Sequence, residues 1–487
     1  MTRTLLVWGC SSGAGKSFVT TALCRWAANQ GINVAPFKAQ NMSNNARVVP
    51  GPGGEPGEIG AAQYFQALAA RVAPEVDMNP VLLKPEADTA SQVVLQGRVD
   101  RHLSTMPWRE RSARLAQTAR QSFERLAKRH ELLIVEGAGS PAEINLAPQD
   151  YVNLGVARWA RELGPTQALL VADIDRGGAF AHLHGTWALL PDDLRPLLAG
   201  FVLNKFRGDA ALLAPAPEQL QQLTGVPTLA VLPMQRDHGL PEEDGLYEAG
   251  SGGSAADALR ITVLAGPHIS NLDEFQPLQA LPNVRLRWAR RAAEALDADW
   301  LILPGSKQVS GDLAWLRTQG LDAVLRAHAA AAKPVLGICG GLQMLGQTLA
   351  DPEGIDGAAH HGLQALSLLP LHTCYAAPKR LRSAGLRFGA LQGAWAPLSG
   401  LALQGYEIRC GHTEGPAPIA HADDGQPIAW QQGSVLGIYA HGLFEQPAFL
   451  QALFGRAAPT LDQALDRLAS NLDAACGAAT LIRLLKP

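Results

Sequence analysis

The 487-residue sequence has no surplus of positive charge, since 41 lysines and arginines stand against 44 aspartates and glutamates and the formal net charge is −3. A basic surface that holds nucleic acid or an anionic membrane is therefore not expected. No stretch is long and apolar enough to span a bilayer, and the apolar run near the N-terminus is too short for a signal peptide. We expect a cytoplasmic protein that binds neither nucleic acid nor membranes.

Cysteine is also scarce: the chain has six, and no two of them form a C-x-x-C pair. A zinc-binding or dithiol motif is therefore not expected, and in a reducing compartment most of the thiols should be free. Hydrophobic residues make up 47% of the chain and charged residues 17%. This composition is typical of a globular protein, and the length suffices for about two to four domains.

The first half alternates short apolar runs with segments of helical length, which predicts a parallel sheet covered by helices on both faces. A helical pattern follows the first run and ends near Gly31. The expected strands are residues 4–8, 132–135, 168–172, 201–203 and 228–232.

A second α/β domain is expected after a linker of small residues at 249–257, which reads AGSGGSAAD. Residues 313–332 have a mostly helical pattern, and the last forty or so residues are expected to form helices packed on this domain. The predicted fold is therefore two doubly wound α/β domains at 1–248 and 258–446, with a helical extension at 447–487. Its expected strands are 261–264, 284–288, 300–303 and 335–338, followed by a β-rich part that includes 405–409 and 434–439.

Residues 9–17 read GCSSGAGKS and lie between an expected strand and an expected helix, which is the context of a phosphate-binding loop. Glycines such as Gly13 and Gly15 let backbone N–H groups converge on phosphate oxygens, and the helix N-terminus adds positive potential. Lys16 would reach the outer phosphates of ATP, and the Ser17 hydroxyl would bind Mg²⁺. Cys10 stands where the usual spacing has glycine, so a chance glycine-rich turn is the alternative.

Polar residues at the ends of other expected strands extend this prediction. Glu136 follows the run LLIV and is a candidate Mg²⁺ ligand, although it can also be a solvated strand-end residue. Asp173 and Asp175 can bind the metal, position a substrate or cap the next turn. Asn204 and Lys205 end a further strand, where an asparagine in related nucleotide-binding folds reads the base.

A second chemical motif is the stretch KPVLGICGGLQML at residues 333–345, in which an expected strand runs through a tight turn into a helix. This is a nucleophile elbow with Cys339 as the nucleophile, and the following helix N-terminus favours its thiolate form. The Gly340 N–H and a second donor near Gly305 would form an oxyanion hole. His441 is the best candidate base; the alternatives are a buried structural thiol and a core histidine.

Several stretches together resemble the cobyric acid synthases, whose halves are a dethiobiotin-synthetase-like phosphate-loop domain and a class I glutaminase domain. The resemblance covers residues 4–445, nearly the whole chain. The stretches are APFKAQNMSNN, MNPVLLKPEAD, VVLQGR, VEGAGSPAEINL, VADIDRGGAFA, LNKFRGD, PHISNLDEF, GICGGLQMLG and GIYAHGLF.

The resemblance implies that the chain amidates the b, d, e and g carboxylates of adenosylcobyrinic acid a,c-diamide, using ATP and L-glutamine. ATP would convert each carboxylate to an acyl phosphate, and ammonia released at Cys339 and His441 would displace the phosphate. Candidate substrate contacts are Gln40, Asn41, Asn44 and Asp173, of which the first three can also be a polar loop. A homo-oligomer is possible.

Two positions depart from the usual family pattern. Leu443 occupies the place, two residues after the histidine, where triad glutaminases have glutamate, so a cysteine–histidine dyad with an unknown orienting group is expected. Gly13 replaces an aspartate of the phosphate loop. The alternatives for function are a cobyrinic acid a,c-diamide synthase and, from another class, a ParA/MinD-like ATPase switch.

Overall fold

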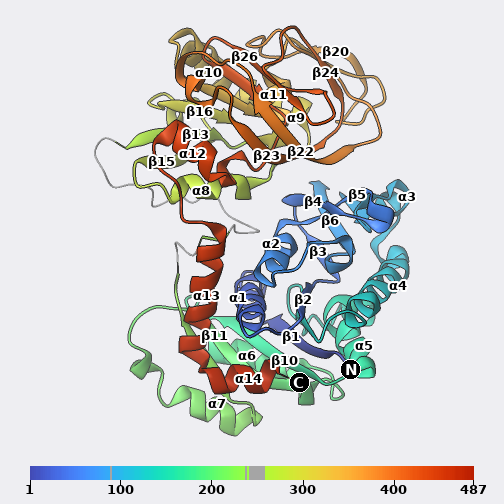
Figure 1. The fold of residues 1–487 in the computed structure, drawn as a ribbon. Helices are drawn as coiled ribbons and strands as arrows, with labels where there is room; N and C mark the ends of the chain where they lie inside the picture. The colour runs from blue at the N-terminus through green and yellow to red at the C-terminus, as the bar shows by residue number, and fades with distance from the viewer. Residues whose placement is uncertain (88–89, 236–238, 241–257, 487) are drawn as a thin grey trace. The chain divides into compact units, whose positions relative to one another are not determined.

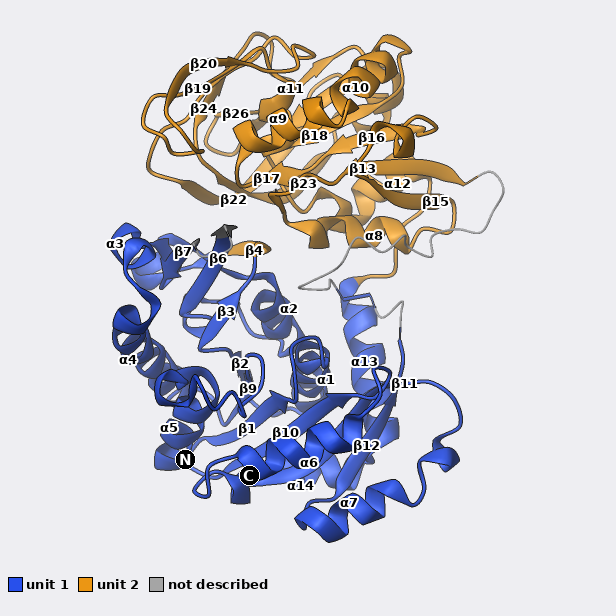
Figure 2. Ribbon diagram, turned by 180° about the vertical axis from the view of Figure 1, so that it is seen from behind, with its two compact units in different colours: residues 1–43, 49–240, 461–487 blue, residues 44–48, 241–460 orange. Residues whose placement is uncertain are grey.

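The computed structural model describes residues 1–87, 90–235, 239–240 and 258–486 (Figure 1). The expected linker at 249–257 lies outside the described residues. The chain forms two compact units, each built from separate stretches of sequence (Figure 2). Unit 1 comprises Met1–Ser43, Val49–Leu240 and Leu461–Pro487, and unit 2 comprises Asn44–Val48 and Pro241–Thr460.

The main sheet of unit 1 has six strands, all parallel, in the order β12-β11-β10-β1-β9-β2. Side chains of β1 alternate between its two faces: Leu5 and Val7 belong to one apolar core, and Leu6 and Trp8 to the other. The strands are β1 (Arg3–Gly9), β2 (Val34–Phe37), β9 (Leu132–Glu136), β10 (Thr166–Asp173), β11 (Leu198–Phe206) and β12 (Thr228–Pro233).

The expected strands of the first half are therefore confirmed, and helices cover both faces of the sheet. The helices of the first half are α1 (Lys16–Asn29), α2 (Ala61–Ala69), α3 (Arg101–Thr105), α4 (Trp108–Ala127), α5 (Val156–Leu163), α6 (Ala179–Leu189) and α7 (Ala216–Thr224). The sequence analysis missed β2 of the main sheet. It also missed the short strands β3 (Gln40–Met42), β4 (Ala46–Pro50), β5 (Pro56–Gly60), β6 (Val81–Ala87), β7 (Ala90–Leu95) and β8 (Arg98–Val99).

The C-terminal helices do not pack where they were expected. α13 (Leu461–Cys476) and α14 (Ala478–Leu485) belong to unit 1, so the expectation that they pack on the second domain is wrong. The buried guanidinium of Arg25 on α1 donates hydrogen bonds to Asp462 Oδ1 at 2.6 Å and Asp466 Oδ1 at 2.7 Å on α13. Only α12 (Pro447–Phe454) of the expected extension belongs to unit 2.

Unit 2 contains a nine-stranded sheet in the order β15-β13-β16-β18-β27-β26-β25-β22-β23. Its first five strands are parallel and the others antiparallel, which is the second α/β domain with the β-rich part that the sequence predicts. The strands are β13 (Leu259–Leu264), β15 (Val284–Ala289), β16 (Trp300–Leu303), β18 (Val335–Ile338), β22 (Arg380–Phe388), β23 (Ala402–Arg409), β25 (Ala420–Ala422), β26 (Pro427–Gln432) and β27 (Val435–Ile438).

The remaining elements of unit 2 surround this sheet. Its helices are α8 (Gln276–Gln279), α9 (Val309–Thr318), α10 (Leu321–Ala330), α11 (Gly340–Leu345) and α12. A four-stranded sheet is formed by β19 (Thr348–Asp351), β20 (His360–Gln364), β21 (His372–Cys374) and β24 (His412–Glu414), and a two-stranded one by β14 (Ile269–Ser270) and β17 (Gly305–Ser306).

Across the described ranges, no single helix is long and apolar enough to cross a membrane. Together α13 and α14 reach that length and composition, but they meet at 103°. Their apolar side chains, among them Leu468 and Leu481, are buried in the core of unit 1.

Candidate active sites

The phosphate loop of unit 1 connects β1 to α1 as expected, and its glycines adopt backbone conformations that other residues disfavour. Gly13 has φ +70° and Gly15 has φ +96°. A Cβ on Gly15 would lie 1.9 Å from Asn204 Nδ2, so no larger residue fits while Asn204 holds its place. Asn204 Nδ2 itself donates to the Ala14 carbonyl at 3.0 Å, which braces the loop.

Lys16 and Ser17 lie where a phosphate-binding site requires them. Lys16 Nζ donates to the carbonyls of Ser11 and Gly139, both at 3.0 Å, so its ammonium lies inside the loop. The Ser17 hydroxyl donates to Glu136 Oε1 at 2.8 Å. The structure thus brings together the two predicted metal ligands, which are far apart in the sequence.

Two residues beside Glu136 were missed by the sequence analysis. Lys38, directly after β2, forms a buried ion pair with Glu136 Oε1 at 2.7 Å, and Gln66 Nε2 on α2 donates to Oε2 at 2.5 Å. Burial raises the pKa of Glu136, but the charge of Lys38 and the hydrogen bonds from Lys38, Gln66 and Ser17 together outweigh burial. The pKa is therefore lowered and the carboxylate stays charged. The sequence did contain a signal for Lys38, which directly follows an apolar run. Residues that follow parallel strands lie at the same edge of the sheet, so Lys38 could have been expected near Glu136.

The other strand-end residues form a network with the loop. Lys205 Nζ donates to the Gly13 carbonyl at 2.8 Å and to Asp173 Oδ2 at 3.1 Å. Asp173 Oδ1 accepts from the Asp175 backbone N–H at 3.1 Å, so Asp173 caps the turn that follows β10. Of the three roles considered for Asp173, the capping role is therefore the one visible in its contacts. Asp175 pairs with Arg207.

The three polar residues expected to contact a substrate fall into different units. Gln40 and Asn41 lie on β3 in unit 1, where Gln40 Oε1 accepts from the Tyr151 hydroxyl at 2.6 Å and the side chain of Asn41 is buried. Asn44 belongs to unit 2. The structure therefore does not join the three residues in one compact unit.

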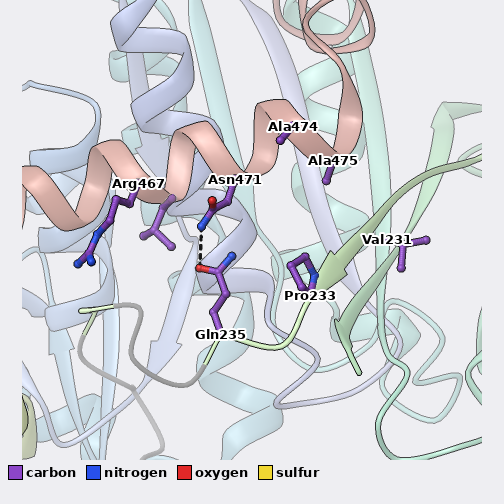
Figure 3. A pocket seen from close by; sticks show the side chains of 8 residues that line it. Val231, Pro233, Gln235, Arg467, Asn471, Ala474 and Ala475 are labelled. Atoms are coloured by element: carbon purple, nitrogen blue, oxygen red, sulfur yellow. Dashed lines mark hydrogen bonds between the residues drawn. The ribbon is translucent and has the colours of Figure 1, made fainter. Parts of the chain in front are cut away.

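A pocket of unit 1 lies between the end of β12 and α13 (Figure 3). Its two facing amides bond to each other, since Asn471 Nδ2 donates to Gln235 Oε1 at 3.1 Å. No residue that the sequence analysis assigned to a site is among the described residues that line it, which are Val231, Pro233, Gln235, Arg467, Leu468, Asn471, Ala474 and Ala475.

The nucleophile elbow of unit 2 has the expected strand–turn–helix geometry. Cys339 follows β18 and precedes α11, with φ +51° and ψ −107°, a strained conformation for a residue other than glycine. Its backbone N–H donates to the Ile438 carbonyl at 2.8 Å, which fixes the elbow against β27. A Cβ on Gly341 would lie 2.0 Å from the Leu303 carbonyl oxygen, so the helix packs on β16 too closely for any other residue.

The two glycines predicted for an oxyanion hole lie beside the same centre. A Cβ on Gly340 would lie 2.8 Å from the Ser306 backbone nitrogen, and one on Gly305 would lie 3.0 Å from His441 Cε1. The structure thus gathers Gly305, Gly340, Cys339 and His441 around one point. Backbone N–H groups there can stabilise a developing oxyanion.

His441 is buried and held from several sides. Its backbone N–H donates to the Tyr406 carbonyl at 2.9 Å, and the Tyr406 ring stacks on the imidazole with centroids 5.3 Å apart. The Nδ1 atom lies 3.1 Å from Glu274 Oε1, and the Cys339 thiol, which donates to the Ile408 carbonyl at 3.5 Å, lies close enough to the ring to affect its pKa. Burial lowers the pKa of His441, but the charges of Glu274 and Cys339 outweigh it and raise that pKa to about 10.

A second cluster of buried charges surrounds these groups within unit 2. Arg47 pairs with Asp273, pairs with Glu445 Oε1 at 2.5 Å, and lies over the Tyr406 ring at 4.9 Å. Burial raises the pKa of Glu445, with Arg47 opposing that rise. Arg47 was not identified from sequence, because it precedes the rest of unit 2 by some two hundred residues and stands in no recognised motif.

Comparisons with known proteins agree with the two-domain organisation of the chain. The family model of the CobQ/CobB/MinD/ParA nucleotide binding domain matches residues 5–245, and that of the CobB/CobQ-like glutamine amidotransferase domain matches residues 260–449. The fold and sites thus define a two-part glutamine amidotransferase, with a phosphate-loop half and a glutaminase half, and the expected enzyme class and fold class are confirmed.

Relatives match over almost the entire chain. Cobyric acid synthase of Paracidovorax citrulli (strain AAC00-1) is 59% identical over 97% of this chain and 96% of its own length. Cobyric acid synthase of Variovorax paradoxus (strain S110) is 59% identical over 97% of both chains, and that of Methylibium petroleiphilum (strain ATCC BAA-1232 / LMG 22953 / PM1) is 58% identical over 99% of this chain and 97% of its own. The chain belongs to the cobyric acid synthase family.

Proposed function

We propose that the protein uses ATP and glutamine to amidate the b, d, e and g carboxylates of adenosylcobyrinic acid a,c-diamide, which yields adenosylcobyric acid in cobalamin biosynthesis. The observation that carries this proposal is the near full-length identity to relatives named cobyric acid synthase, together with two separate sites suited to the two half-reactions. These substrates are intracellular metabolites, so a cytoplasmic location remains our prediction.

In the proposed ligase reaction a substrate carboxylate oxygen attacks the γ-phosphorus of ATP, and the bond from that phosphorus to its bridging oxygen breaks to release ADP. Ammonia then attacks the acyl phosphate carbon, and inorganic phosphate leaves. Activation is needed because an unmodified carboxylate would have to expel oxide. The position of Lys16 Nζ inside the phosphate loop supports a role in stabilising the transferred charge.

Ser17 and Glu136 are the residues that would hold Mg²⁺. Both offer oxygen atoms, and they lie 2.8 Å apart at the sheet edge. Among the described residues no group of three His, Cys, Asp or Glu side chains could hold a metal, but Mg²⁺ in such sites takes most of its ligands from phosphate and water. When bound, the ion would neutralise charge on the phosphate oxygens.

In the proposed glutaminase reaction the Cys339 thiolate attacks the glutamine amide carbon, and His441 gives its proton to the departing ammonia. Water then hydrolyses the glutamyl thioester, with His441 as the base. The strained elbow, the adjacent N–H groups and the buried imidazole support these roles.

The test is to incubate the protein with ATP, Mg²⁺, glutamine and adenosylcobyrinic acid a,c-diamide and to follow the corrinoid by mass spectrometry. We expect four successive amidations, each a replacement of OH by NH₂. In Cys339→Ala, glutamine should no longer support amidation, whereas free ammonia should restore it to near the wild-type rate with ammonia. Glutamine hydrolysis without any change of the corrinoid would contradict the substrate assignment and leave the enzyme class standing.

Neither alternative function has a specific observation in its favour. A cobyrinic acid a,c-diamide synthase would act on the a and c positions, and the same product analysis distinguishes it. A ParA/MinD-like switch gives no account of the amidotransferase match at residues 260–449.

A further inference from the structure

In this chain the sequence position that usually carries the triad carboxylate is occupied by a leucine, Leu443. Leu443 begins the short helix η10 (Leu443–Glu445), is buried, and packs in the core of unit 2. His441 nevertheless has a carboxylate partner, which comes from a different part of unit 2. We propose that Glu274 is the positioning residue of a Cys339–His441–Glu274 triad whose acid precedes the nucleophile in the chain; this inference rests on the proposed glutaminase reaction.

The geometry around Glu274 suits an orienting carboxylate. Glu274 lies on the short helix η7 (Leu272–Phe275), and its side chain and that of His441 are each 1% exposed. One carboxylate oxygen faces His441 Nδ1 at 3.1 Å, and the other accepts from the Gly442 backbone N–H at 3.3 Å. Because an ionised carboxylate only accepts, Nδ1 must carry the proton, which leaves Nε2 to act on Cys339 and the substrate.

Neighbouring charges do not supply the same function. Arg47 neutralises Asp273 and Glu445, the two other carboxylates of this region, and no hydrogen bond between either of them and His441 is seen among the described residues. Tyr406 contacts the flat face of the imidazole, not its nitrogen atoms. The titratable and charged groups around Glu274 are Arg47, Asp273, Cys339, Tyr406, His441 and Glu445.

The arrangement gives Glu274 two tasks in each turnover. It holds the imidazole in one tautomer and orientation, and it stabilises the imidazolium that faces the Cys339 thiolate. Replacement by glutamine keeps the size but removes the charge, so the imidazolium loses its proton at a lower pH. The Cys339 sulfur then loses the imidazolium as its counter-ion at a lower pH than in the wild type.

The experiment compares wild type, Glu274→Gln, Glu274→Asp and the matched control Glu445→Gln in the full-length protein. Glutamate release from glutamine is measured against pH. For Glu274→Gln we expect kcat to fall by about 100-fold with KM changed less than about 3-fold, because orientation acts on the chemical step. The alkaline limb of the pH profile should move to lower pH. Glu274→Asp should recover part of kcat, and Glu445→Gln should keep the wild-type profile.

A second readout needs neither turnover nor a corrinoid. Iodoacetamide alkylation of the Cys339 peptide is followed by mass spectrometry, with the exposed Cys374 as the internal reference. In Glu274→Gln the Cys339 rate near pH 7 should fall several-fold, whereas the Cys374 rate at each pH should equal that in the wild type.

The inference would be overturned if Glu274→Gln had the same kcat, the same pH profile and the same rate of Cys339 alkylation as the wild type. Equal losses in Glu274→Gln and Glu445→Gln would also overturn it, since they would indicate a general effect of buried charge. Both readouts concern glutamine and the thiol alone, so they give an answer whether or not the corrinoid substrate is correct.

Discussion

At the scale of single residues, both sites depend on glycines that let a functional side chain come close to the backbone. Gly15 makes room for Asn204, and Gly305 makes room for His441. The side chains of Asn204 and His441 are both buried and hydrogen-bonded, so moving either of them away would cost free energy. The closeness of these contacts makes the two glycines sensitive positions for testing the two half-reactions separately.

Gly15→Ala should abolish the ligase half-reaction and spare glutamine hydrolysis. The new Cβ would lie 1.9 Å from Asn204 Nδ2 on a backbone with φ +96°, so the loop must shift. A displacement of about 1 Å costs about 100-fold in a positioned reaction, and we expect at least that loss in kcat/KM for ATP. The measurement is ammonia-dependent corrinoid amidation at varied ATP.

Gly185→Ala is the control for this change, because nothing lies within 4 Å of a Cβ at that helical glycine. It should leave both activities unchanged. If Gly15→Ala kept the wild-type activity, the prediction would be wrong. The Asn204 side chain would then be able to move aside, and the loop would tolerate a side chain at position 15.

The residues that sequence predicted best are those embedded in a local motif. Lys16, Ser17 and Cys339 stand in stretches whose spacing alone implies a loop or an elbow. Glu274 and Lys38 could not be found in this way, because each acts on a partner far along the chain, and only the fold brings the two together. For Glu274, the absence of an acid from its usual position at Leu443 was a sign that a compensating carboxylate should be sought elsewhere in the chain.

At the scale of elements, apolar runs predicted the parallel strands well because a strand buried on both faces must be continuously apolar. The same reasoning could not place α13. An amphipathic helix shows that it needs a partner surface, and the nearest surface in sequence was the second domain. The structure instead packs its apolar side chains with those of α1, and Trp26 Nε1 donates to Asp473 Oδ1 at 3.2 Å.

Leu468→Ala should therefore destabilise unit 1. Leu468 is 1% exposed and packs in the core that α1 and α13 share, so truncation leaves a cavity costing about 2–5 kcal/mol. We expect faster hydrogen exchange, followed by mass spectrometry, in peptides of α1 and unchanged exchange in peptides of β16 and β18. Ser470→Ala on the exposed side of α13 is the control. It should change the free energy of unfolding by less than about 0.5 kcal/mol and leave hydrogen exchange nearly unchanged. Faster exchange in β18 instead would contradict this placement of the helix.

At the scale of the whole molecule, the chain leaves unit 1, builds nearly all of unit 2, and returns to complete unit 1 with residues 461–487. The nucleotide-binding half is therefore discontinuous in sequence, and its last two helices are made after the amidotransferase half. Sequence patterns could not predict this, because composition and periodicity carry no information about which of two apolar surfaces a terminal helix will cover.

Removal of residues 461–487 tests this organisation directly. Without α13 and α14 the buried Arg25 guanidinium loses both carboxylate partners, and the apolar side chains of α1 lose their cover. The exposure of this apolar surface to water costs several kcal/mol, at about 25 cal/mol per Å², and the two ion pairs are lost with it. We expect ammonia-dependent amidation to fall by more than about 100-fold, whereas glutamine hydrolysis at Cys339 persists, because all its described residues lie in unit 2. If the helices instead supported the glutaminase half, the truncation would abolish hydrolysis and leave ammonia-dependent amidation intact; measuring both activities on one preparation decides between the two.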